Sequence, residues 1–209
     1  MGAPSASPVV LASGNAGKLR EFAELFAPLG WQFQPQSVLG ITTPEETGST
    51  FLDNALLKAR HAAKLSGLPA LADDSGLEVD ALGGAPGVYS ARYAGEEADD
   101  AANIDKLLTT LAAVDGGLAD TARTARFRCV IAYVRNAVDP QPIIGVGVWE
   151  GRILKQPQGT GGFGYDPVFM DLASGCSAAE LPAATKNARS HRGAALRDWF
   201  TKWSEAHRS

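Results

Sequence analysis

Residues 8–30 read PVVLASGNAGKLREFAELFAPLG, and this stretch predicts a strand, a loop and a helix in succession. Its first part, Pro8 to Ser13, is a short apolar run rich in valine and leucine, which is typical of a buried strand. A turn that contains glycine follows, and Gly30 stands where helices commonly end. Between them an apolar stripe recurs at helical spacing, at Leu19, Phe22, Phe26 and Leu29. The order of strand, polar loop and helix favours an α/β fold.

A second helix is predicted from Thr50 to Gly67. Thr50 and Asp53 stand at the spacing of a capping box, and Pro69 follows the expected end. Further along we expect a small strand at 70–73, a glycine-rich loop at 74–87 and a helix at 99–113. Two β-rich stretches follow at 124–135 and 143–154, then a short strand at 167–170 and a helical segment at 184–206. Turn residues separate the two β-rich stretches, so we expect them to pair antiparallel within a mixed sheet.

The composition of the 209-residue chain is that of an ordinary globular enzyme. We expect a flexible tail at residues 1–7 and one folding unit over residues 8–209. A net charge of −4 argues against a nucleic-acid polymer as partner. No apolar run approaches the roughly 20 residues that span a membrane. The two cysteines, Cys129 and Cys176, are far apart, which suits a reducing compartment and a cytoplasmic location.

The loop Ser13-Gly14-Asn15-Ala16-Gly17-Lys18 lies where the first strand runs into a helix. Free backbone N–H groups and the helix dipole at such a start attract anions, and Lys18 adds a positive charge. The loop is no Walker A motif, because only two residues separate its glycines and Leu19 replaces the magnesium-binding hydroxyl. The alternative is a tight turn that carries a surface lysine.

Acidic side chains gather in two places. Asp73 and Asp74 stand at the end of a predicted strand and precede Ser75-Gly76, and such adjacent carboxylates favour a divalent metal site. In a strand the side chains of Asp73 and Asp74 would point to opposite faces, so a metal site would need only one of them as a ligand. The alternative is an Asx turn. Glu45 and Glu46 stand near the second helix, either as further ligands or as a solvated pair.

The stretch Gly159 to Gly164 matches the dinucleotide-binding pattern G-x-G-x-x-G, but it leads into a strand rather than a helix. We interpret it as a loop that presents Phe163, Tyr165 and Asp166. An aromatic ring there would stack on a nucleobase, and the carboxylate would read the base edge. The alternative is that these aromatic rings pack against the core.

Positive charge concentrates near the C-terminus, at Lys186, Arg189, His191 and Arg192. These donors suit a polyphosphate or a base rich in carbonyl groups. The alternative is the solvated face of a helix.

In this order the motifs resemble the inosine triphosphate pyrophosphatase family, also described as Ham1-like. The resemblance covers essentially the whole chain, and its bacterial dITP/XTP branch is indicated by the strings LADDSGLEVDALGGAPGVYSARYAG, GGFGYDPVF and SHRGAAL. It implies a two-lobed α/β fold with a long central mixed sheet flanked by helices, an active site in the cleft between the lobes, and a homodimer. It also implies Mg²⁺-dependent hydrolysis of dITP, ITP and XTP to the monophosphate and pyrophosphate, which removes deaminated purines from the nucleotide pool.

The resemblance further implies roles for matching residues. Asp74 would be a metal ligand and general base, with Lys18 as the second catalytic group, and one of Glu45 and Glu46 would complete the metal site. The substrate would be bound by Ser13, Gly14, Asn15, Ala16, Gly17, Lys18, Lys58, Ser75, Phe163, Gly164, Tyr165, Asp166, Lys186, His191 and Arg192. Donors such as His191 and Arg192 would select the 6-oxo group of inosine and xanthosine over the amino group of adenosine.

Two rival functions stay open at this point. One is a pyrophosphatase with the same phosphate machinery that acts on modified pyrimidine or canonical nucleotides. The other is a nucleotide-binding sensor without turnover, for which the anion loop and the basic cluster would suffice. The carboxylates argue against a sensor, because a protein that only binds polyanions has little use for acids near phosphate unless a metal joins them.

Overall fold

The computed structural model describes residues 8–14, 19, 22, 31, 33–115 and 123–208. The expected tail at 1–7, the loop positions Asn15 to Lys18 and most of the first predicted helix lie outside these residues. The described strands are β1 (Val9–Leu11), β2 (Phe33–Pro35), β3 (Ala70–Val79), β4 (Thr124–Val134), β5 (Ile143–Ile153) and β6 (Phe169–Asp171). The α-helices are α2 (Phe51–Ser66), α3 (Asp100–Asp115), α4 (Ala183–Arg189) and α5 (His191–Ala206). Short 3₁₀ turns are η2 (Gln36–Leu39), η3 (Asp80–Leu82), η4 (Gly87–Arg92), η6 (Asp166–Val168) and η7 (Ala178–Glu180).

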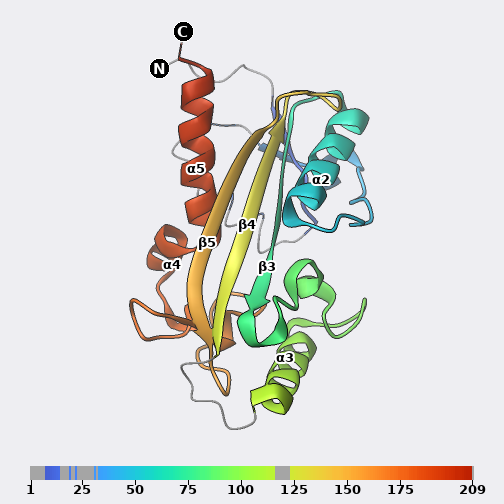
Figure 1. Cartoon of the computed structure of the whole chain (residues 1–209). Helices are drawn as coiled ribbons and strands as arrows, with labels where there is room; N and C mark the ends of the chain where they lie inside the picture. Colours follow the sequence, from blue (N-terminus) through green and yellow to red (C-terminus); the bar gives the residue numbers. More distant parts are fainter. Residues whose placement is uncertain are drawn as a thin grey trace. The chain divides into compact units, whose positions relative to one another are not determined.

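The strands form one six-stranded sheet in the order β2-β1-β3-β4-β5-β6. Its long strands β3, β4 and β5 are labelled in Figure 1. β1 pairs parallel with β2 and with β3, whereas β5 pairs antiparallel with β6. The predicted α/β class with a mixed sheet is therefore confirmed. Within the described part of the chain, no helix has the length and hydropathy needed to cross a membrane.

The chain divides into two compact units. Unit 1 comprises Met1–Asp74, Cys129–Gly147 and Arg192–Ser209, and unit 2 comprises Ser75–Arg128 and Val148–His191. The long strands β3, β4 and β5 each contribute residues to both units, whereas β1 and β2 belong to unit 1 and β6 belongs to unit 2.

The core of unit 1 packs helix α5 against the sheet. Trp199 is fully buried there beside Leu71, Ile131 and Tyr133. Burying a side chain of this kind stabilises the fold by about 1.5–3 kcal/mol. The close approach of α5 needs glycine on β5, because a Cβ at Gly145 would collide with the Ala195 carbonyl and with Trp199.

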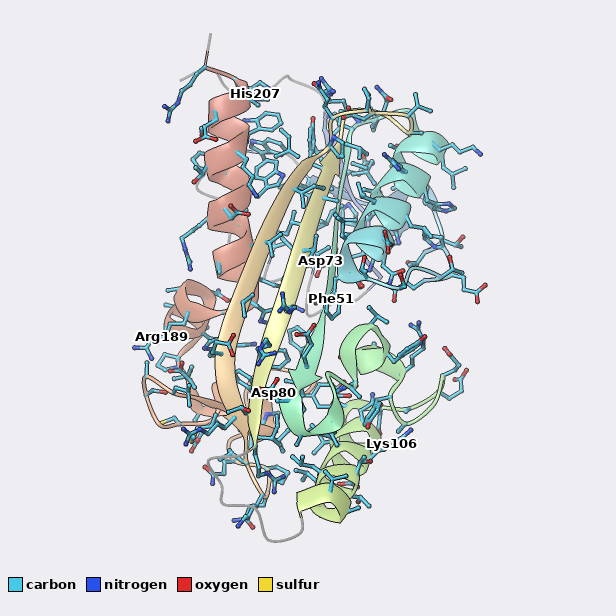
Figure 2. The ribbon with its side chains drawn as sticks, in the orientation of Figure 1. Phe51, Asp73, Asp80, Lys106, Arg189 and His207 are labelled. Carbon is cyan, nitrogen blue, oxygen red and sulfur yellow. The ribbon has the colours of Figure 1, made fainter. Side chains whose placement is uncertain are left out.

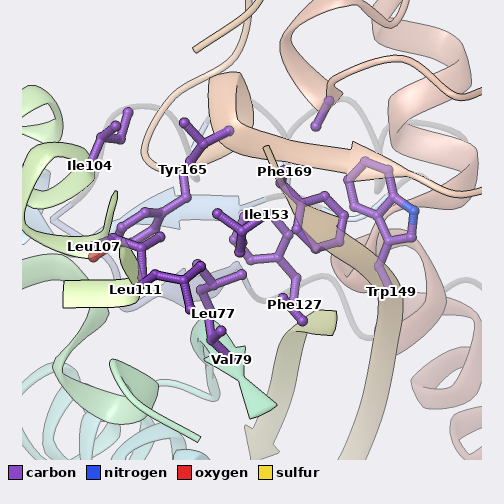
Figure 3. Close-up of a cluster of buried hydrophobic side chains, with 13 residues drawn as sticks. Leu77, Val79, Ile104, Leu107, Leu111, Phe127, Trp149, Ile153, Tyr165 and Phe169 are labelled. Atoms are coloured by element: carbon purple, nitrogen blue, oxygen red, sulfur yellow. The ribbon is translucent and has the colours of Figure 1, made fainter. Parts of the chain in front are cut away.

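Unit 2 has a core of its own, drawn in Figure 3. Leu107 and Leu111 of α3 pack against Leu77 and Val79 of β3, and the rings of Phe127 and Phe169 lie 4.5 Å apart. The apolar face of α3 thus packs on the part of β3 that carries Leu77 and Val79.

The predicted helix at 50–67 is confirmed as α2. Thr50 caps it, because the Thr50 hydroxyl accepts a hydrogen bond from Asp53 N at 3.1 Å. At the other end Gly67 adopts a left-handed φ of 70° and its N–H donates to the Ala63 carbonyl.

Two predicted boundaries were wrong. The strand expected at 70–73 runs on to Val79 as β3, because Ser75 and Gly76 continue its extended backbone instead of starting a loop. The helical segment expected at 184–206 is two helices, since Ser190 between α4 and α5 has an extended backbone with ψ of 157°. The short strand β2 had no clear signal in the sequence.

Candidate active site

A buried lysine of unit 1 lies between two carboxylates. Lys58 on α2 donates to Glu46 Oε1 at 2.6 Å and to Asp74 Oδ1 on β3 at 2.9 Å. The Lys58 and Asp74 side chains are each 6% exposed, while the Glu46 side chain is 21% exposed. We call Glu46, Asn54, Lys58 and Asp74 the acid–lysine cluster.

The charge of Lys58 is set by its neighbours. Burial by itself lowers the pKa of Lys58, but the negative charges of Asp74, Asp73 and Glu46 raise it above the ordinary value. Lys58 therefore stays an ammonium at neutral pH, and the cluster holds both signs of charge at close range.

Asn54 forms hydrogen bonds both to strand β3 and to the loop on which Glu46 lies. Its side-chain N–H donates to Asp74 Oδ2 at 3.2 Å, and its Oδ1 accepts from Gly48 N at 2.8 Å. A Cβ at Gly48 would collide with Asn54 and Asp53, so only glycine allows this approach. Asn54 precedes Lys58 by four residues on α2, and one helix face therefore presents both side chains to Asp74.

The neighbouring acid, Asp73, has a different partner. Arg192 at the start of α5 places its Nε 3.7 Å from Asp73 Oδ2, and both residues are buried. Figure 2 labels Asp73 where it lies along the sheet. Because successive residues of a strand point to opposite faces, Asp74 meets α2 while Asp73 meets α5.

The end of β1 reaches the same region of unit 1. β1 and β3 run parallel with Leu11 paired to Leu71, and Ala12 N donates to the Leu71 carbonyl at 2.8 Å. Ser13 is buried and Gly14 is exposed at this strand end. The predicted anion loop thus begins beside the strand that carries Asp73 and Asp74.

A second group of predicted site residues lies in unit 2, around Asp166. Asp166 Oδ2 accepts from Phe163 N and from Lys186 Nζ, both at 2.8 Å. The Lys186 ammonium also lies 5.0 Å from the centre of the half-buried Phe163 ring. A Cβ at Gly162, whose φ is 73°, would collide with the Asp166 carboxylate. We call Phe163, Asp166 and Lys186 the aromatic–lysine cluster.

Two further predicted residues of unit 2 pack against its core. The Tyr165 ring is buried and its hydroxyl donates to the Ser90 carbonyl at 2.8 Å. The buried ring of His191 stacks on Phe127 at 4.7 Å. Tyr165 therefore fits the alternative that aromatic side chains of this loop pack inwards. Arg189 is bound to Asp171 at 2.6 Å, outside the aromatic–lysine cluster.

The donor set of the acid–lysine cluster suits Mg²⁺. Among the described residues, no three histidine, cysteine, aspartate or glutamate side chains form a group that would hold a metal by themselves. Magnesium is commonly bound by one or two carboxylates together with water and substrate phosphates, and Asp74 and Glu46 are two carboxylates, a hard-oxygen donor type, beside one lysine. Glu45, in contrast, is exposed.

Comparison with known proteins adds to this geometry. Residues 9–202 match the family model of the Ham1 family. The chain belongs to the Ham1 family. A dITP/XTP pyrophosphatase of Shigella flexneri is 58% identical over 189 residues, which cover 90% of this chain and 94% of that protein. The dITP/XTP pyrophosphatase of Escherichia coli strain K12 is 56% identical over the same length and the same shares. The resemblance to this family, drawn from the motifs, is thereby confirmed.

Solved structures of Ham1 proteins share the fold. The HAM1 protein of Coxiella burnetii matches with a TM-score of 0.86 and 52% identity, over 95% of this chain and 98% of that one. The Ham1 protein of Staphylococcus aureus matches with a TM-score of 0.80 and 38% identity, over 97% of this chain and all of that one.

The structure groups six of the residues predicted for the site into two clusters. Lys58 and Asp74 belong to the acid–lysine cluster with Glu46, and Phe163, Asp166 and Lys186 form the aromatic–lysine cluster. Sequence reasoning missed Asn54, although its position one helical turn before Lys58 was a usable signal.

Proposed function

We propose that this Ham1 family chain is a nucleoside triphosphate pyrophosphatase that hydrolyses non-canonical purine nucleotides, namely dITP, ITP and XTP, to the monophosphate and pyrophosphate. The observation that carries the proposal is the sharing of Lys58 by Asp74 and Glu46, which combines a fixed cation with two oxygen ligands. Relatives that are 56–58% identical over 90% of the chain are named dITP/XTP pyrophosphatases.

In the proposed reaction a water molecule attacks the α-phosphorus and the bond to the β-phosphate oxygen breaks. Asp74 accepts the proton of the water, and pyrophosphate leaves. The bonds from Lys58 and Asn54 fix the orientation of the Asp74 carboxylate. Ser13 to Lys18 bind the triphosphate, with Lys18 offsetting the charge on the leaving pyrophosphate, and Ser75 contacts the substrate.

We propose that Mg²⁺ is held by Asp74 and Glu46. When bound there, it supplies positive charge that neutralises the triphosphate oxygens. Glu46 is preferred over the exposed Glu45 because Glu46 shares Lys58 with Asp74.

The aromatic–lysine cluster is proposed to bind the base. The Phe163 ring would stack on the purine, and Lys186, oriented by Asp166, would donate to the 6-oxo group. Gly164, His191 and Arg192 complete the proposed contacts, while Tyr165 supports the loop from the core. An adenine amino group would leave such donors without an acceptor, at a cost on the order of 1–3 kcal/mol per buried donor.

The remaining proposals concern assembly and location. We propose that the chain forms a homodimer and works on the nucleotide pool of the cytoplasm. Both cysteines are free thiols in the structure, Cys129 buried and Cys176 exposed, which agrees with a reducing compartment.

The proposed function is tested by pyrophosphate release from the purified chain with Mg²⁺. dITP and XTP are compared with dATP, dGTP and dCTP, with and without EDTA, and Asp74→Asn serves as the matched inactive variant. We expect fast, EDTA-sensitive release from dITP and XTP, and a loss of about 100- to 10,000-fold in kcat for Asp74→Asn. Equal rates on all five nucleotides would overturn the base selectivity, and binding without release would favour the sensor.

A further inference from the structure

A side chain of α3 holds the peptide that follows Phe163. Gly164 N donates to Asp100 Oδ2 at 2.7 Å, across a sequence separation of 64 residues. At the other end of the same peptide, the Phe163 carbonyl accepts from Asp166 N at 3.3 Å. The peptide plane between Phe163 and Gly164 is thus held on both sides.

Asp100 is not needed to cap its own helix. The preceding residue, Asp99, does this, because its Oδ1 accepts from Ala102 N at 2.8 Å. The carboxylate of Asp100 therefore serves a contact outside α3, and a hydrogen bond to a carboxylate is stronger than one between neutral groups.

The peptide at Gly164 needs such a bond. Gly164 has a φ of 59° and Gly162 a φ of 73°, so glycine flanks Phe163 on both sides. Glycine rotates through left-handed and right-handed conformations at similar energy, and a loop of this kind has little intrinsic preference for one peptide orientation. Buried groups hold the neighbouring positions, Asp166 at Phe163 N and the Ser90 carbonyl at the Tyr165 hydroxyl.

We propose that Asp100 is a positioning residue for base recognition: by holding Gly164 N it fixes the orientation of Phe163 beside Lys186. This inference rests on the proposed function, in which the Phe163 ring stacks on the purine. Asp100 contacts no substrate atom in this proposal and acts through the loop alone.

The test compares Asp100→Ala with Asp100→Asn and with Asp105→Ala. The asparagine variant keeps a side-chain oxygen that accepts from Gly164 N, and Asp105→Ala removes the same charge from an exposed position of α3. We expect Asp100→Ala to raise KM for dITP by about 3- to 10-fold with little change in kcat, as the loss of one positioning hydrogen bond implies. Asp100→Asn should recover most of this loss, and Asp105→Ala should match the wild type.

A second readout needs no activity. Hydrogen exchange of the Gly164 amide in the unliganded protein should speed up in Asp100→Ala and stay slow in Asp105→Ala. Unchanged exchange, or a KM for dITP equal to that of the wild type, would overturn the positioning role. A wild-type protein that does not hydrolyse dITP would overturn the proposed function instead, and the exchange experiment would still decide whether Asp100 holds the loop.

Discussion

Lys58 donates to Asp74 Oδ1 at 2.9 Å, and both side chains are almost completely buried. A buried ion pair of this kind gives little net stability, but removing one partner leaves the other charge without compensation. The pair therefore places a fixed negative group on β3 at the cost of making the fold depend on Lys58.

Lys58→Met should destabilise the fold. It leaves the buried Asp74 facing no ammonium, which costs about 3–5 kcal/mol for buried pairs. Because the pKa of Lys58 is raised, its stabilising charge is fully present below its ordinary pKa and is lost only as the pH rises through the higher folded value. Urea unfolding should hence show the same decrease in the free energy of unfolding, relative to the wild type, throughout about pH 6 to 9. The control is Lys64→Met at an exposed position of α2, expected to change stability by less than about 0.5 kcal/mol. A loss that shrinks between neutral pH and pH 9 would contradict the raised pKa.

Glu46→Gln and Glu45→Gln form a matched pair that tests the choice between the two acids. Glu46 shares Lys58 with Asp74, whereas Glu45 is exposed. We expect Glu46→Gln to raise the Mg²⁺ concentration needed for half-maximal activity by about 10- to 100-fold, and Glu45→Gln to leave it unchanged. Magnesium titrations of pyrophosphate release measure both. The opposite ranking would assign the ligand to Glu45.

Asp139→Asn should lower stability in a way that depends on pH. Asp139 lies between β4 and β5, where it accepts from the side chain and the backbone N–H of Arg135 and from Gln141 N. Hydrogen bonding to the Arg135 guanidinium holds the pKa of Asp139 well below its usual range. Its contribution is therefore present above the unfolded pKa of about 4 and is lost as the pH falls through the folded value.

We expect the melting temperature of Asp139→Asn to lie several degrees below that of the wild type at neutral pH, with the gap narrowing below about pH 4. Thermal unfolding followed by circular dichroism across this range measures it. A difference in melting temperature that stays constant with pH would mean that the negative charge of Asp139 adds nothing to the hydrogen bonds that its side-chain oxygens accept.

Gly145→Ala should destabilise unit 1 by about 1–3 kcal/mol, the usual cost of overpacking a core. The added Cβ meets the Ala195 carbonyl and Trp199, so α5 must move away from β5. Val146→Ala, at the adjacent position that is 43% exposed, is the control and should change stability much less. Denaturant unfolding of the two variants is sufficient. Equal stability of Gly145→Ala and the wild type would show that α5 shifts without cost.

Local signals predicted much of the secondary structure. The capping pair Thr50–Asp53 and the glycine at 67 located α2 to within a residue, because caps depend on neighbours in the sequence. β3 was predicted too short because Ser75-Gly76 is a turn signal by itself, yet neighbouring strands supply pairing partners that outweigh it. The break at Ser190 was missed for a similar reason, since 184–206 contains no proline and only one glycine.

The sequence by itself determined the α/β class, the family and the residue types that the chemistry needs, because periodicity, caps and ordered motifs depend only on the order of residues along the chain. The tertiary structure decided which groups meet. Lys58 donates to Glu46 rather than to Glu45, and Asn54 donates to Asp74. Arg192 lies beside Asp73, and Asp100 accepts from the peptide N–H that follows Phe163. These contacts join residues far apart in the chain. Their distances are set by how helices pack on the sheet, and no local pattern records that packing.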